Sequence, residues 1–191
     1  MRLFREAHLI SRAMTLTTTI WGVASISAVS LFLAASAFVY FGIYNVAATD
    51  PHWSWVSRIM EIVRVRSIKA HASDVAAPSN LRDEAMILMG VEHFAAHCAV
   101  CHGAPGVPKG DIALGLYPEP PDLAQSSERY RPNEIFWIVK NGIKMSGMPS
   151  WKDHDEEELW STVAFILKLP EMTEDEYGRL LMESMINEDH H

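Results

Sequence analysis

The stretch HCAVCHG, residues 97–103, decides how this chain is interpreted, because it contains both cysteines of the sequence. Cys98 and Cys101 are spaced i and i+3, and His102 follows the second cysteine directly. Three chemistries compete for this pattern: a redox dithiol, half of a zinc site, and covalent attachment of haem. The segments on either side are needed to choose between them.

The segment before the cysteines is predicted to be a helix that ends at the motif. Apolar residues recur at helical spacing in RDEAMILMGVEHFAAHCAVCH, among them Met86, Val91 and Phe94. Residues i and i+3 of a helical turn lie on the same side, so Cys98 and Cys101 can both reach one planar ligand. From residue 81 onward the pattern alternates between helices and loops, without convincing alternating strands. We therefore predict an all-α domain.

Covalent haem attachment is the chemistry that uses every residue of the motif. A thioredoxin-like dithiol needs a surrounding βαβ pattern, which the sequence lacks. A structural zinc site usually has four ligands, and no second Cys/His pair follows at finger spacing. We predict one covalently attached haem c, with Cys98 and Cys101 forming thioethers to the vinyl groups and His102 binding the iron.

A second iron ligand is expected downstream, and the stretch NGIKMSGMPSW, residues 141–151, offers two methionines. His/Met ligation raises the reduction potential of haem into the range of electron carriers. Met145 and Met148 are therefore both candidates. Their position in a loop fixed by a proline argues against a role in packing alone.

From about residue 81 to 169 the chain resembles a class I c-type cytochrome domain of the bacterial monohaem kind. The resemblance rests on CAVCH, on GMPSW and on the spacing of the helices. It implies that Met148, the methionine before the proline, binds the iron, with Met145 as the competitor. It also implies that the carbonyl of Pro121 orients His102 and that Leu123 packs on the ring.

The same resemblance implies a cytochrome c fold of about three core helices around one haem. Its first and last helices should cross where a glycine meets an aromatic residue, which maps onto Gly90 and Phe165, with Phe94 at the family's spacing. The last helix is expected to begin near Asp153. The acidic residues 156–158 then lie at the positive end of the helix dipole and are interpreted as a solvated capping cluster, with a docking patch for a basic partner as the alternative.

An uncleaved membrane anchor is predicted near the N-terminus. No charged residue lies between Arg12 and Asp50, and residues 20–44 are apolar or small throughout. A helix of this length reaches roughly 37 Å, enough to cross a hydrocarbon core of about 30 Å. The alternative is a cleaved signal peptide with a cleavage site at residues 35–37, but the apolar run continues past that site.

The segments on either side of the anchor complete the predicted organisation. Residues 51–73 read as a basic amphipathic helix, with Trp55, Ile59, Ile62 and Val63 at helical spacing. This helix is expected either on the membrane surface or a partner membrane subunit, or packed on its own domain. The other predicted segments are a cytoplasmic N-terminus (1–19), a linker (74–80), the cytochrome c domain (81–170) and a helical C-terminal extension (171–191).

Charge is distributed unevenly along the chain. Residues 1–73 carry a formal balance of +4 and residues 74–191 a balance of −12. A strongly acidic domain binds nucleic acid poorly, because phosphate contacts need clustered Lys and Arg. We therefore expect no nucleic-acid partner, and interpret the charge as suited to a basic protein partner or to solubility.

The predicted function is electron transfer by a single-pass, membrane-tethered monohaem cytochrome, and not catalysis. Respiratory or photosynthetic-type redox proteins are the expected partners, with the chain acting as a subunit of a membrane electron-transfer complex. The alternatives are a free-standing anchored shuttle and, in a different class, a haem peroxidase or sensor with an open sixth site. Because haem is attached to CxxCH outside the cytoplasmic membrane, we expect the domain on the periplasmic side of a bacterial inner membrane.

Overall fold

The computed structural model describes residues 2–188, and the side chains of residues 14–186. It divides the chain into two compact units, Met1–Ala47 and Ala48–His191. Met1, in the predicted N-terminal segment, and residues 189–191, at the end of the predicted extension, lie outside the described residues. The two units are described separately.

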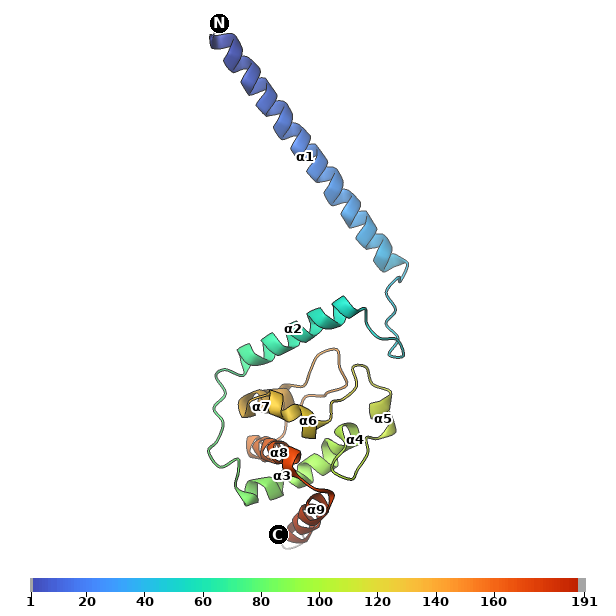
Figure 1. Ribbon diagram of the computed structural model, residues 1–191, viewed down its shortest axis with the longest axis vertical. Coiled ribbons are helices and arrows are strands. Elements are labelled where there is room, and N and C mark those ends of the chain that lie inside the picture. The colour runs from blue at the N-terminus through green and yellow to red at the C-terminus, as the bar shows by residue number, and fades with distance from the viewer. Residues whose placement is uncertain (1, 189–191) are drawn as a thin grey trace. The chain divides into compact units, whose positions relative to one another are not determined.

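The first unit consists of a long apolar helix, α1 (Arg2–Tyr40, Figure 1). Its stretch Met14–Tyr40 has a mean hydropathy of 2.0, and none of the most apolar part is buried. At 1.5 Å per residue this stretch spans about 40 Å, which is enough to cross a bilayer. The helix starts before residue 20, the predicted start of the anchor. It also ends before residue 44, the predicted end of the anchor, because Gly42 turns the backbone to a positive φ of 58°. The helix thus ends at Tyr40, four residues before the predicted end of the anchor, and the bounds of the anchor itself stay a prediction.

The core of the second unit is made of helices alone, as predicted. It is built from α3 (Glu84–His97), α7 (Pro132–Asn141) and α8 (Glu156–Lys168), and α3 packs most extensively on α8. Among the described residues there is no named strand, and an isolated bridge joins Ala104 and Val107. The all-α fold with three core helices is thus confirmed.

The crossing of α3 and α8 occurs where the sequence predicted it. A Cβ atom on Gly90 would lie 2.0 Å from the carbonyl oxygen of Ser161, so the two backbones touch at this glycine. One turn further, the rings of Phe94 and Phe165 lie 4.9 Å apart and are fully buried. This close approach fixes the direction in which α3 runs toward Cys98.

Short helices and long loops connect the core helices, in keeping with the proline and glycine content of these segments. These short elements are α4 (Ala99–His102), α5 (Asp111–Leu114), α6 (Leu123–Ser126), η1 (Ser127–Arg129) and η2 (Leu169–Glu171). The last core helix, α8, starts later than expected. Its N-cap is Asp155, which accepts a hydrogen bond from the backbone N–H of Glu157 at 3.0 Å, so the predicted start near Asp153 is corrected by three residues.

The C-terminal helix α9 (Glu174–Glu188) packs on α3. Tyr177 is 5% exposed, and its ring lies 6.1 Å from that of Phe165. The predicted extension therefore belongs to the same compact unit as the domain that was expected to end at residue 170. Tyr177, Leu180 and Leu181 of this helix pack on the hydrophobic core, whereas Met182, Met185 and Ile186 are exposed.

Helix α2 (Ser54–His71) has two apolar faces. Its C-terminal end packs near α7, where Ile68 and Ala72 are buried and Asn133 donates a hydrogen bond to the Ala72 carbonyl at 2.6 Å. The other face keeps at least half of each side chain exposed, at Trp55, Ile59, Ile62 and Val63. One end of the helix is thus held by its own unit, while the predicted apolar face stays uncovered.

Candidate functional site

Both cysteines and the following histidine lie on one turn, residues 98–102, where α3 passes into α4. We call it the CxxCH turn. The carbonyl oxygen of Cys98 accepts hydrogen bonds from the backbone N–H groups of Cys101 at 3.0 Å and His102 at 2.9 Å. Both thiols are free in the described part of the chain. The turn therefore presents two thiols and an imidazole within one helical turn.

The first thiol is held in its neutral form. Cys98 is 6% exposed, and burial, with a smaller effect of Cys101, raises the pKa of its thiol to about 12. The thiolate is the form that attacks disulfides and binds metals. A neutral Cys98 thus weighs against the redox dithiol.

His102 is oriented by a carbonyl from a distant part of the chain. Its Nδ1 atom lies 2.8 Å from the carbonyl oxygen of Pro121, 19 residues later. Burial lowers the pKa of His102 against the opposing effect of this hydrogen bond, and the charge of Lys109 lowers it further. The ring is thus kept neutral with Nδ1–H donating to Pro121, which leaves Nε2 as a free electron-pair donor.

The loop that supplies this carbonyl, residues 103–122, is held in place by its own hydrogen bonds. Lys109 Nζ donates to the Pro120 carbonyl and to Glu119, both at 2.6 Å. Asp122 then caps α6 by accepting from the backbone N–H of Ala124 at 2.9 Å. Leu123, the first residue of α6, is partly buried against the hydrophobic core. The structure places Pro121 and Leu123 on either side of a fixed helix start.

The second candidate segment, residues 142–151, folds back on the end of α7, and we call it the methionine loop. Gly142 has a φ of 66°, and a Cβ atom there would lie 2.6 Å from the Pro149 backbone. The backbone N–H of Ile143 donates to the Met148 carbonyl at 3.2 Å, and that of Trp151 donates to the Val139 carbonyl at 3.3 Å. The loop is therefore held at both of its ends.

The two methionines of this loop have different environments. Met148 is partly buried, and its backbone N–H donates to Ser146 Oγ at 3.2 Å. Met145 is 76% exposed and has a positive φ of 56°, which places it on the outside of the turn. Burial of the thioether suits a ligand that must exclude water, so the environments favour Met148.

The methionine loop meets the loop that orients His102. A Cβ atom on Gly147, next to Met148, would lie 2.5 Å from the side chain of Leu116. Leu116 belongs to residues 103–122, the loop that also provides Pro121. The fold thus brings the methionine loop to the loop that carries the partner of His102.

The donors present fit a covalently held haem. The chain offers two free thiols on one turn, an imidazole whose Nδ1 is occupied, and a partly buried thioether on a loop that adjoins the histidine's loop. These are the groups that c-type haem attachment and His/Met ligation require. The roles of Cys98, Cys101, His102 and Met148 stay predictions with a consistent geometry.

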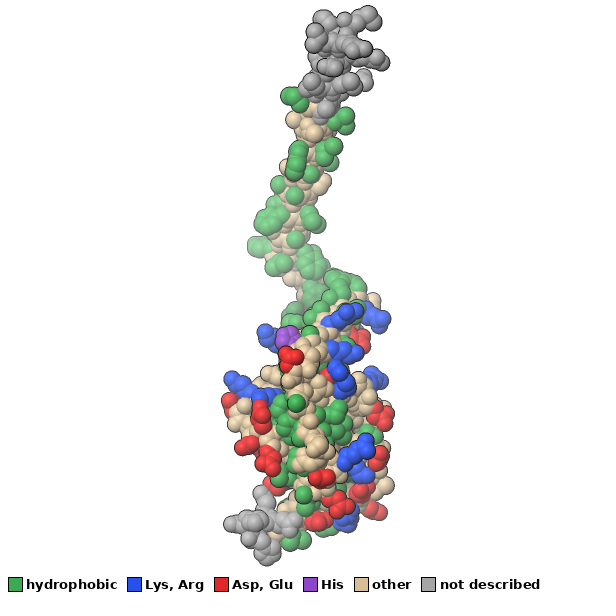
Figure 2. Space-filling view, turned by 90° about the vertical axis from the view of Figure 1, so that its left-hand side faces the viewer, with side chains coloured by type: hydrophobic (Ala, Val, Ile, Leu, Met, Phe, Trp, Pro, Cys, Tyr) green, Lys and Arg blue, Asp and Glu red, His purple; other side chains and the backbone are tan. Residues whose placement is uncertain are grey.

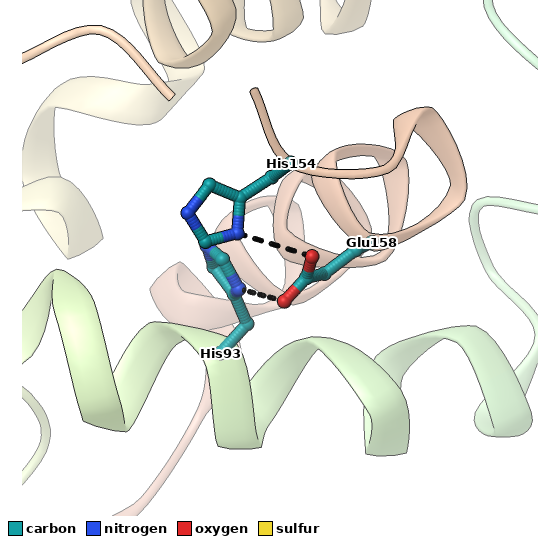
Figure 3. A group of neighbouring side chains, drawn as sticks. All are labelled: His93, His154 and Glu158. Atoms are coloured by element: carbon teal, nitrogen blue, oxygen red, sulfur yellow. Dashed lines mark hydrogen bonds and ion pairs between the residues drawn. The ribbon is translucent and has the colours of Figure 1, made fainter. Parts of the chain in front are cut away.

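A second group of side chains received no role from the sequence. It comprises His93 and His97 of α3, His154 before α8, and Glu158 of α8, and we call it the histidine cluster. Glu158 takes one hydrogen bond from each of two rings, with Oε1 2.6 Å from His93 Nδ1 and Oε2 3.1 Å from His154 Nδ1 (Figure 3). Glu158 is therefore not only part of a solvated capping cluster, as its place at the helix N-terminus had suggested.

The cluster also changes the proton affinity of its members. Burial lowers the pKa of His93, although the hydrogen bond and charge of Glu158 oppose it, and His97 and His154 lower it further. Burial alone would raise the pKa of Glu158, but the hydrogen bonds and charges of His93 and His154 outweigh it and hold that pKa below its usual value. The sequence signal was two i, i+4 pairs, HxxxH and HxxxE, on helices predicted to cross.

Comparison with protein families gives one match. The family model described as cytochrome c oxidase, cbb3-type, subunit III matches residues 85–166. This stretch contains the CxxCH turn, the methionine loop and most of α3 and α8, and it leaves out α1, α2 and α9. No curated protein matches the chain.

Proposed function

Because residues 85–166 form a c-type cytochrome domain that binds haem c covalently and transfers electrons, we propose that the whole chain is an electron carrier held at a membrane by α1. The support for anchoring is the exposed apolar stretch Met14–Tyr40, which suits hydrocarbon better than water. An anchor restricts the haem domain to partners on the same membrane surface. Transfer then does not depend on diffusion through the bulk.

In this proposal each residue of the CxxCH turn has one task. Cys98 and Cys101 hold the haem, and His102 binds its iron through Nε2. When bound, the haem supplies reversible one-electron chemistry at the iron. The observation that carries the proposal is the 2.8 Å contact between His102 Nδ1 and the Pro121 carbonyl, because it selects the tautomer that an iron ligand needs.

Met148 is proposed as the second axial ligand. It is the partly buried methionine of its loop, and Met145 is exposed. If His102 and Met148 both bind the iron, no coordination site would be left for substrates or gases. The chain itself then acts in electron transfer and not as a peroxidase or sensor.

We further propose that the chain works as a subunit of a membrane oxidase complex. The matched family is named for a subunit of a cbb3-type cytochrome c oxidase, and the match covers the haem domain. The acidic charge of residues 74–191 suits a basic docking surface on the partner. The proposed location is the periplasmic face of a bacterial inner membrane, because covalent haem attachment takes place there.

Helix α2 is proposed to lie on the membrane surface. Its apolar face, with Trp55, Ile59, Ile62 and Val63, is at least half exposed although the helix is held by its own unit through Ile68. Basic side chains accompany this face at Arg58, Arg66 and Lys69, and Figure 2 shows hydrophobic and basic side chains close together where α2 lies. A helix with these two kinds of side chain binds at the interface of an anionic bilayer.

The subunit role is tested by purifying the full chain from native membranes in mild detergent. We expect a haem stain that survives denaturation and a set of co-purifying oxidase subunits in stoichiometric amounts. A haem-loaded chain that leaves the membrane alone, and exchanges electrons with a soluble partner, would establish the free-standing shuttle in its place. A chain that binds carbon monoxide at its resting haem would favour the sensor or peroxidase class.

The position of α2 is tested by hydroxyl-radical footprinting of the full chain in lipid nanodiscs. Trp55 and Met185 are both 59% exposed, and Met185 lies on α9, so the pair is matched in exposure. Each oxidation rate is normalised to that of the same residue in the urea-unfolded chain. We expect Trp55 to be protected several-fold more than Met185, and equal protection would refute the proposal for α2.

A further inference from the structure

The histidine cluster lies outside the CxxCH turn and takes no part in the proposed ligation of haem. Its four members come in two pairs, each spaced by one helical turn: His93 and His97 on α3, and His154 and Glu158 at the start of α8. The close contact at Gly90 fixes how these helices cross, so the pairs face each other on a rigid support. Three imidazoles and a carboxylate gathered in this way are the donors of a transition-metal site.

The ligand atoms of the cluster lie up to about 1 Å further apart than the ligands of a bound metal ion. Ligand atoms of His93, His154 and Glu158 all lie within 4.8 Å of one another. Zinc holds nitrogen and oxygen ligands at about 2.0–2.2 Å, so two ligands of one ion are about 3–3.5 Å apart. Side-chain rotations that move these atoms by on the order of 1 Å close the difference. His154 has the freedom to rotate, because 31% of its side chain is exposed.

A fourth donor is within reach. The ring of His97 lies 4.6 Å from the ring of His93 and 5.5 Å from that of His154, measured between centroids. His97 is exposed, so its side chain can turn toward the cluster without disturbing the core. With His97, the cluster offers three imidazole rings and one carboxylate, which are the four ligands of a closed tetrahedral site.

The ring of His93 is buried and only partly hydrogen-bonded. The residue is 5% exposed, and its Nε2 atom has no hydrogen-bond partner among the described residues. A buried polar nitrogen without a partner is costly, and native proteins contain few of them. Since Nδ1 already lies 2.6 Å from Glu158 Oε1, a cation bound by both residues would take the electron pair of Nδ1 in place of the proton that these two atoms share.

We propose that His93, His154 and Glu158, with His97 as the fourth ligand, bind one divalent transition-metal ion, with zinc as the best-suited species. The donors are mainly imidazole nitrogens, which favour Zn²⁺, Cu²⁺ and Ni²⁺ over Ca²⁺ or Mg²⁺. The carboxylate of Glu158 balances part of the ion's charge. The carboxylate of Glu158 already faces both rings, with one oxygen near each Nδ1 atom, and the ion would replace the protons between them (Figure 3).

The site would join the two segments that carry the proposed haem ligands. His97 directly precedes Cys98, and Trp151 of the methionine loop packs on the cluster, 4.8 Å from the ring of His97 and 5.2 Å from that of His154. An ion bound by α3 and the start of α8 therefore ties the CxxCH turn to the end of the methionine loop. Metal binding should stabilise this region of the domain against unfolding.

The test is calorimetric titration of Zn²⁺ into the full-length, haem-loaded protein in detergent, after treatment with chelator. All variants carry His190→Ala and His191→Ala, which removes a terminal histidine pair that could bind zinc by itself. We expect one zinc ion per chain, and weakening of its affinity by at least tenfold in His154→Ala and in His97→Ala. These two residues are exposed or partly exposed, so their loss should leave the fold intact.

His71→Ala is the matched control, since His71 is an exposed histidine on α2 outside the cluster. It should bind zinc as tightly as the parent. Cu²⁺ in place of Zn²⁺ gives a second readout, because its paramagnetic resonance spectrum should show nitrogen ligands that are lost in His154→Ala. Absence of stoichiometric zinc binding, or equal affinity in His154→Ala, His97→Ala and the control, would overturn the proposal. Neither result depends on the electron-transfer role.

Discussion

Two groups of histidines in this domain are positioned by different means. His102 belongs to a motif of five consecutive residues, and its ring is oriented by a neutral carbonyl, that of Pro121. His93 and His154 are 61 positions apart, and their rings are held by one carboxylate, that of Glu158. The CxxCH turn is local in sequence, whereas the histidine cluster exists only because two helices cross.

The partner of each ring decides its chemistry. A carbonyl acceptor leaves the imidazole of His102 neutral, with the in-plane electron pair of Nε2 free to bind one metal ion. A carboxylate shared between two imidazoles brings a negative charge into the cluster, and so favours either a proton or a divalent cation. The same kind of side chain is therefore proposed as a ligand to haem iron in one place and as part of a metal site in the other.

Removing both cysteines should show the largest difference between the CxxCH turn and the histidine cluster. In the double variant Cys98→Ala, Cys101→Ala no thiol remains for a thioether, so we expect no haem on the denatured chain. Haem staining after denaturing electrophoresis measures this. His154→Ala, in the other region, should keep its full haem content, and haem persisting on the double variant would contradict the assigned attachment.

The support shared by both regions is the crossing at Gly90. In Gly90→Ala the new Cβ atom would lie 2.0 Å from the Ser161 carbonyl oxygen, so the helices must separate, and we expect a loss of about 3 kcal/mol of stability. Urea unfolding of the haem-loaded protein measures it.

The control is Gly178→Ala on α9, where a Cβ atom would meet nothing within 4 Å. This change should stabilise the protein by up to about 1 kcal/mol through helix propensity alone. Both exchanges are glycine to alanine within a helix, so their difference isolates the contact. Equal effects of the two exchanges would show that α3 and α8 are not in close contact at Gly90.

Replacing the proposed methionine ligand tests the haem site without touching the histidine cluster. Met148→Leu should remove the thioether ligand and lower the reduction potential by on the order of 0.1 V, within the range of about 0.8 V that axial ligands span. Met145→Leu, at the exposed position, should leave the potential and the absorption spectrum unchanged. Potentiometric titration distinguishes the two, and the reverse result would assign Met145 as the ligand.

The pH dependence of stability tests the cluster by itself and should be the smallest effect. The pKa of His93 is lower in the folded chain than its ordinary value of about 6.5, so the unfolded chain binds more protons in this range. Stability should therefore fall as the pH drops below about 6.5, by less than about 1.4 kcal/mol per pH unit for one group. His93→Gln should reduce this fall, measured by urea unfolding at pH 7.5 and 5.5 with chelator present. An identical fall in parent and variant would count against the lowered pKa.

Particular residues show how far the sequence could predict the fold. Gly90, Phe94 and Phe165 were placed correctly at a helix crossing, because the resemblance to c-type cytochromes implies that the first and last helices meet at these positions. The end of the anchor and the start of α8 were misplaced by a few residues, since Gly42 and Asp155 act through backbone conformation and capping that composition does not reveal. The extension beyond residue 170 proved to pack on α3, because Tyr177 finds its partner, Phe165, only in three dimensions.

The sequence by itself was enough to predict haem attachment at the CxxCH turn, the all-α class and the apolar helix α1, because each depends on residues that are neighbours along the chain or recur at helical spacing. The resemblance to c-type cytochromes had implied the pairing of Pro121 with His102 and the choice of Met148, and the tertiary structure gave these expectations their geometry. Only the tertiary structure showed that His93, His154 and Glu158 meet. These relations join residues between 19 and 65 positions apart, and one helix crossing sets the distances in the cluster. Residue spacing along the chain does not determine these distances, because they depend on how the helices and loops pack in three dimensions.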